Sequence, residues 1–149
     1  MPQVAPTTIL RIIRRWLARP LPWLAAFVLW VAAMFTASSF AVPDAAPSVE
    51  IPHFDKVIHF CWFTIGGVIL GAAVLTIPRL RANRMARLIL PMVMLSLLGA
   101  LDEFRQSFTP GRTGNDTGDW LADTLGGVAG VLVVNAARRR IMRFPEERF

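Results

Sequence analysis

The sequence is poor in the residues and motifs that mark the common soluble enzymes. It contains one cysteine, Cys61, which excludes an intramolecular disulfide and any CxxC motif. The GxSxG, HExxH and P-loop patterns are also absent, so the chemistries that depend on them have no support. Charged residues make up only 17 % of the chain, against 54 % hydrophobic residues and a mean hydropathy of +0.49. This balance predicts a protein that crosses a membrane several times.

The uncharged runs have the length that membrane helices need. Crossing a bilayer takes about 20 apolar residues. Two uncharged runs meet this requirement, over about 21–41 and 57–77. Two shorter runs, over about 88–104 and 119–135, carry acids toward one end, and we predict that they span the membrane as well. We therefore predict an all-α integral membrane protein, with a four-helix domain over 21–137 between basic tails at 1–20 and 138–149. A cleaved signal peptide is the rival interpretation of the first run, because Ser39-Phe40-Ala41 resembles a cleavage site, but the run is longer than a signal's apolar region.

The basic residues predict the orientation of the chain in the membrane. They lie mainly in three arginine clusters, each beside an apolar run, at 11–19, 79–87 and 138–148. The positive-inside rule then places both termini in the cytoplasm. The same distribution argues against a nucleic-acid partner and favours contact with membrane lipids. The excess of arginine over lysine, with no tyrosine, suggests a bacterial genome and hence a bacterial plasma membrane.

Glycine and proline positions predict how the helices pack. Gly67 and Gly71 are four residues apart, as are Gly126 and Gly130, and this spacing permits close approach of helices. The fourth run is only thinly apolar, so we expect it inside the bundle. Pro91 is expected in the first turn of a short third span, where a missing N–H costs least.

Polar residues gather at the three helix ends that this topology places outside the cytoplasm. Residues four apart share a helix face, and three such pairs occur: Asp55/His59, Asp102/Gln106 and Asp119/Asp123. We predict that these faces line one pocket. The turn at 109–114 holds Arg112, whose guanidinium suits a phosphate or carboxylate. Because polar groups beside lipid are costly, this end of the chain is the predicted functional site.

The same residues form a recognisable series of motifs. In chain order they are Asp55-Lys56-x-x-His59-Phe60, Glu103-x-x-Gln106-x-Phe108-x-Pro110-Gly111-Arg112 and Asp119-x-x-x-x-Thr124-x-Gly126-x-x-x-Gly130. Their combination, over about residues 50–135, resembles the VanZ-like family of small bacterial membrane proteins, named for a teicoplanin-resistance determinant. The resemblance implies a role in the cell envelope, outside the cytoplasm. Asp123 departs from the family's usual asparagine and adds a charge.

Each candidate residue also has a structural interpretation. The candidate catalytic residues are His59 and Glu103, and the candidate ligand-binding residues are Arg112, Gln106, Asp119, Asp123 and Asp55. The structural alternatives for His59, Glu103 and Gln106 are a hydrogen bond of His59 to Asp55 or to another helix, and Glu103 and Gln106 as caps of the third span. Asp102 would be a solvated carboxylate at a helix end, and Asp119 a cap or first-turn acid. Asp123 would pair with Arg112 or His59, Arg112 would clamp Asp119 or Asp123, and Asn115 and Asp116 would be turn residues. A metal site formed by His59 with Glu103, Asp119 or Asp123 is a minor alternative. One histidine with carboxylates is a poor zinc set and would suit magnesium or manganese better. The main prediction includes no metal and no other cofactor.

Three functions follow from these residues. The first is binding of an anionic lipid-linked or cell-wall ligand; the family resemblance implies a link to teicoplanin resistance. The second is an integral-membrane enzyme that acts on an envelope lipid or cell-wall precursor by His59 and Glu103 acid–base chemistry. A transporter is disfavoured, because the polar residues gather at one end instead of crossing the membrane. The substrate and the oligomeric state stay open.

Overall fold

The computed structural model describes residues 15–40, 53–112 and 114–141. These residues form helices and connecting turns, without a β-strand. The elements are α2 (Pro20–Ser38), α3 (Phe54–Thr76), α4 (Pro78–Ala82), α5 (Arg84–Gln106) and α6 (Thr117–Ile141). Most of the two predicted basic tails, and the proline-rich loop over 41–52, lie outside the described residues.

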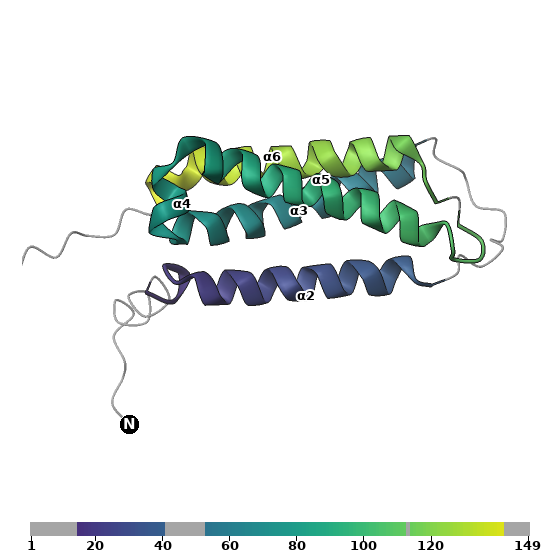
Figure 1. The fold of residues 1–149 in the computed structure, drawn as a ribbon, viewed down its shortest axis with the longest axis horizontal. Coiled ribbons are helices and arrows are strands. Elements are labelled where there is room, and N and C mark those ends of the chain that lie inside the picture. The colour runs from purple at the N-terminus through teal and green to yellow at the C-terminus, as the bar shows by residue number, and fades with distance from the viewer. Residues whose placement is uncertain (1–14, 41–52, 113, 142–149) are drawn as a thin grey trace, which may run out of the picture.

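Four of the helices, α2, α3, α5 and α6, are long and apolar enough to cross a membrane. They run side by side along the length of the molecule, and the short α4 joins α3 to α5 at one end (Figure 1). The predicted all-α bundle of four membrane helices is therefore confirmed. Many of its large apolar side chains face outward, as expected where lipid replaces water.

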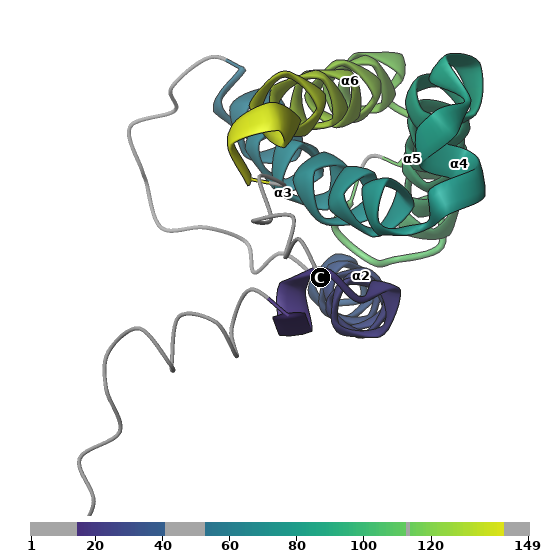
Figure 2. The ribbon, with the colours of Figure 1, turned by 90° about the vertical axis from the view of Figure 1, so that its left-hand side faces the viewer.

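Helix α3 is the centre of the bundle. It contacts α2, α5 and α6, whereas α6 contacts only α3 and α5 among the described elements. Helix α2 lies to one side of the other three (Figure 2), and its Trp30 stacks on Phe27 and meets Phe63 of α3 edge-on. The sequence predicted that the fourth span, α6, lies inside the bundle. The central helix is instead the second span, α3, which has a glycine face and many buried side chains.

The glycines of α3 and α6 allow these two helices to touch through their backbones. A Cβ atom on Gly67 would lie 2.5 Å from the carbonyl oxygen of Gly127, and one on Gly130 would lie 2.9 Å from Cα of Gly67 and clash with the carbonyl of Thr64. Backbone atoms cannot move aside as a flexible side chain can. The predicted close approach at the glycine faces is therefore confirmed.

Helix α5 is longer than the sequence suggested, and this corrects the place of Pro91. The helix begins at Arg84, where the side chain of Asn83 accepts a hydrogen bond from the N–H of Ala86. A cap of this kind satisfies a free N–H of the first turn and lets the helix start among the arginines. Pro91 consequently lies inside the helix instead of in its first turn.

The two ends of the bundle differ in character. One end carries α4 and the arginines at 79–87, and we call it the arginine end. The other end, which we call the polar end, is formed by Ser38, the start of α3, the end of α5 and the start of α6. All the candidate site residues lie at the polar end.

Candidate functional site

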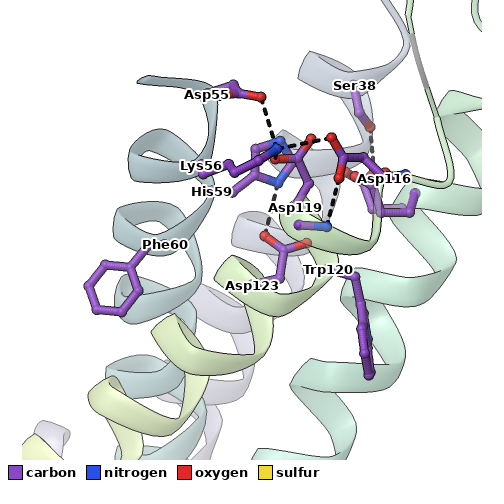
Figure 3. Close-up of polar contacts among 12 residues, drawn as sticks. Ser38, Asp55, Lys56, His59, Phe60, Asp116, Asp119, Trp120 and Asp123 are labelled. Atoms are coloured by element: carbon purple, nitrogen blue, oxygen red, sulfur yellow. Dashed lines mark hydrogen bonds and ion pairs between the residues drawn. The ribbon is translucent and has the colours of Figure 1, made fainter. Parts of the chain in front are cut away.

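His59 and Asp123 form a buried pair between α3 and α6. His59 Nδ1 lies 2.9 Å from Asp123 Oδ1, and its N–H donates to the carboxylate. Asp123 is fully buried, and its second oxygen, Oδ2, has no hydrogen-bond partner among the described residues. The histidine therefore pairs with Asp123, one of the predicted alternatives, and not with Asp55. Figure 3 shows the imidazole between Asp123 on one side and Lys56 on the other.

Lys56, the chain's single lysine, holds three carboxylates together. Its Nζ lies 2.9 Å from both Asp116 and Asp119 and 3.3 Å from Asp55 (Figure 3). The contact with Lys56 lowers the pKa of the Asp116 carboxyl, which lies in the loop before α6. Asp55 is exposed, and its side chain pairs with Lys56 among the described residues.

Asp116, predicted to be only a turn residue, makes two further contacts in the structure. Its Oδ1 accepts a hydrogen bond from the N–H of Gly118, which is the contact of a helix-capping residue. Asp119 lies in the first turn of α6, as one of its structural interpretations expected. Asp116 therefore starts the helix and also neutralises part of the charge on Lys56.

Glu103 accepts two hydrogen bonds from the loop that leads to α6. Its Oε2 accepts the N–H of Asp116 at 2.9 Å, and its backbone carbonyl accepts the N–H of Asn115 at 3.2 Å. Asn115 has a φ of 65°, a left-handed conformation that asparagine tolerates better than most residues. The carboxylate is 4 % exposed, and Oε1 has no partner among the described residues.

Asp102 is not the solvated helix-end carboxylate that was expected. It is 3 % exposed, because α2 covers it. Ser38 Oγ donates to Asp102 Oδ1 at 2.6 Å, and Gln106 Nε2 donates to Oδ2 at 2.8 Å. Arg105 lies 3.8 Å away and also hydrogen-bonds Ser39. Both oxygens of Asp102 are thus satisfied within the protein.

Arg112 is positioned by a tight turn at the end of α5. Its N–H donates to the carbonyl of Thr109 at 3.2 Å, with Pro110 and Gly111 between them. Gly111 has a φ of 77°, which this kind of turn requires at its third residue and which glycine adopts without strain.

The guanidinium of Arg112 has neutral partners. It lies 3.3 Å from the carbonyl of Ala37 and 3.5 Å from Gln106 Oε1. Among the described residues it pairs with no carboxylate. The expected clamp on Asp119 or Asp123 is therefore wrong, because the turn directs Arg112 toward α2 and away from α6.

A pocket of about 310 Å³ opens between α2, α3 and the end of α5. His59, Asp102, Gln106 and Arg112 supply its polar wall. The remainder is mainly apolar and includes Met34, Ile58, Trp62 and Phe63. Glu103, Asp119, Asp123 and Asp55 do not line it. The three polar faces therefore meet at one end of the bundle without sharing one pocket. His59 lines the pocket and also lies beside Glu103, Asp119 and Asp123, which do not line it.

Four residues of this assembly were not among the predicted site residues: Ser38, Lys56, Arg105 and Asp116. The sequence could have indicated Lys56 as a site residue, because it is the single lysine and lies inside the first motif. Almost nothing in the sequence indicates Ser38 as a site residue, since a serine is common at the end of an apolar helix. Its role depends on how α2 is rotated against α5.

Two groups of side chains have a geometry that suits a cation. A nitrogen of His59 and carboxylate oxygens of Glu103 and Asp119 lie within 4.8 Å of one another, as do oxygens of Asp55, Asp116 and Asp119. Lys56 already occupies the second group with its ammonium. The first group is the more enclosed of the two.

Comparison with known proteins identifies the family. The sequence pattern of the VanZ/LLP1 family matches residues 10–138, which is most of the chain. Searches of curated proteins and of solved structures gave no significant match. The match extends beyond the three motifs into α2 and the arginine end, so it covers the whole bundle. The chain is a multi-pass membrane protein that belongs to the VanZ/LLP1 family.

Proposed function

We propose that this protein binds an anionic amphiphile, a lipid-linked or cell-wall-related molecule, in the pocket between α2, α3 and α5. The observation that carries the proposal is the guanidinium of Arg112, which among the described residues pairs with no carboxylate and lines a pocket with a largely apolar wall. A phosphate or carboxylate would supply the negative charge that pairs with the guanidinium of Arg112. An acyl or prenyl chain would cover Met34, Ile58 and Trp62.

The size and composition of the pocket support a ligand of this kind. Its volume of about 310 Å³ is at the lower end of the range found for small-molecule sites. The pocket therefore suits a head group and the first part of a chain, with the remainder of the chain in the bilayer. Asp102 does not repel the anion strongly, because Ser38 and Gln106 satisfy its oxygens and Arg105 lies near.

The orientation and the biological setting complete the proposal. We place the polar end outside the cytoplasm and both termini inside, in a bacterial plasma membrane, because the arginine clusters follow the positive-inside rule. The pocket then faces the side where cell-wall precursors are used. The family resemblance adds a link to teicoplanin resistance, which a change in the inhibitory concentration of teicoplanin on deletion of the gene would test.

Native mass spectrometry of the purified protein tests ligand binding. The wild-type protein should retain an anionic lipid, and Arg112→Gln should lose it. Arg79→Gln is the matched control, because it removes the same charge from an exposed position at the arginine end, away from the pocket. Equal retention by Arg112→Gln and the wild type would overturn the proposal.

The His59–Asp123 pair favours a second candidate, an enzyme acting on an envelope lipid or cell-wall precursor. A histidine that lines a pocket and is oriented by a buried carboxylate is the arrangement of a general base. In this case His59→Gln should leave lipid binding intact and abolish turnover of the bound molecule. An unchanged lipid and cell-wall profile on deletion of the gene would remove this candidate.

A further inference from the structure

A histidine and two carboxylates from three different helices converge beside the pocket. His59 belongs to α3, Glu103 to α5 and Asp119 to α6, and one ligand atom of each lies within 4.8 Å of the other two. Glu103 and Asp119 are 4 % and 8 % exposed. The group is therefore enclosed by the bundle and differs from the solvated acidic clusters that are common on protein surfaces.

His59 has the second contact that a metal-binding histidine usually makes. A ligating imidazole generally donates its other N–H to a carboxylate, which fixes the ring and its tautomer. Here Nδ1 contacts Asp123 at 2.9 Å, so Nε2 is the nitrogen left to coordinate. Asp123 is fully buried and cannot serve a solvent-facing role instead.

Glu103 has an oxygen without a partner. Its Oε2 accepts the N–H of Asp116, but the buried Oε1 has no hydrogen bond among the described residues. Leaving a buried carboxylate oxygen unpaired is costly. A cation held between Glu103, His59 and Asp119 would satisfy it.

The charge balance of the polar end favours a cation. Its described residues include six acids and three bases, a formal excess of three negative charges when every carboxyl is ionised and His59 is neutral. The acids are Asp55, Asp102, Glu103, Asp116, Asp119 and Asp123, and the bases are Lys56, Arg105 and Arg112. Lys56 contacts Asp119 through Oδ1, which leaves the other oxygen of that carboxylate for a second positive charge.

We propose that His59, Glu103 and Asp119 bind a divalent cation, with Asp123 as the outer carboxylate that orients His59. The proposal does not depend on what occupies the pocket. One imidazole nitrogen with two carboxylates is a donor set of mixed character, which suits Mn²⁺ better than Mg²⁺ or Ca²⁺. Three protein ligands leave further coordination positions for water or for an oxygen of a bound molecule.

Manganese binding to the full-length protein tests this site. The chelator-treated protein, in phosphatidylcholine nanodiscs, is titrated with Mn²⁺ while electron paramagnetic resonance records the free ion. We expect saturable binding of one ion per chain. Pulsed measurements on the bound ion should show coupling to a histidine nitrogen, and this coupling should disappear in His59→Gln.

Variants separate this site from the outer acidic group. Glu103→Gln and Asp119→Asn should each weaken Mn²⁺ affinity by about tenfold or more. Loss of an outer partner of a metal ligand already costs about tenfold in affinity, and loss of a ligand should cost at least as much. Asp55→Asn is the matched control, because it also removes one negative charge near Lys56 but lies outside the proposed ligands, and it should bind as the wild type does. Absence of saturable binding would overturn the proposal. Bound Mn²⁺ without nitrogen coupling in the wild type would overturn it too, and this result needs no variant to fold.

Discussion

Asp123 is the residue whose substitution should report most directly on the polar end. It is fully buried and accepts the N–H of His59. Asp123→Ala should lower the free energy of unfolding by about 1–3 kcal/mol, because it leaves the histidine donor unpaired in the bundle. Titration of the purified protein with a denaturing detergent measures this change.

Asp123→Asn is the informative counterpart. Asparagine is the usual residue of the family at this position, and its side-chain oxygen can still accept from His59. This variant should be clearly more stable than Asp123→Ala. If the two variants unfolded alike, the hydrogen bond to His59 would have no part in the stability of the bundle.

At the same residue scale, sequence reasoning found the candidate side chains but not all of their partners. The i, i+4 spacing of Asp55 and His59 is local, and it correctly placed both on one end of one helix. The contact of His59 with Asp123 joins residues 64 positions apart. The sequence offered it only as one of several alternatives, because it depends on the rotation of α6 about its axis. The burial of Asp102 depends likewise on α2, which covers it with Ser38. Such rotations are set by packing across the whole bundle.

At the scale of the helices, α3 and α6 are held by contact between their glycine faces. Gly130→Ala would place a methyl group against the backbone of Thr64, Gly67 and Val68, which cannot yield without separating the helices. We expect a loss of about 1–3 kcal/mol in the free energy of unfolding, as for other overpacked sites.

Ala136→Val is the matched control for this helix. Ala136 is exposed on α6, so added methyl groups there meet lipid or detergent instead of another helix. The same unfolding titration should show little change. Comparable losses in Gly130→Ala and Ala136→Val would mean that the close contact of the two helices does not limit stability.

Hydropathy alone is sufficient to predict the long helices of this protein, but not where each one begins. It located all four long helices, because each must satisfy its own backbone and present apolar side chains to lipid. It misjudged the start of α5, since the charged residues before Leu88 lie outside the apolar run. The cap at Asn83 is a local hydrogen bond that hydropathy does not register.

At the scale of the whole molecule, the arginine clusters make a definite prediction of orientation. A green fluorescent protein fused after residue 149 should fluoresce, because it folds in the cytoplasm. Alkaline phosphatase fused after Arg112 should be active, because it requires the other side of the membrane. Both results follow from both termini lying inside with four spans between them. An active phosphatase fused after Arg81, at the arginine end, would contradict this orientation.

The position of α6 in the chain has a consequence for biogenesis. It is the last of the four spans to be synthesised, and membrane helices insert before they associate. Until α6 arrives, α3 lies in the bilayer without Asp123 beside His59 and without Asp119 beside Lys56, and its glycine face is uncovered. The C-terminal span is therefore the step that converts a set of inserted helices, with ionisable groups left in lipid, into an assembled bundle.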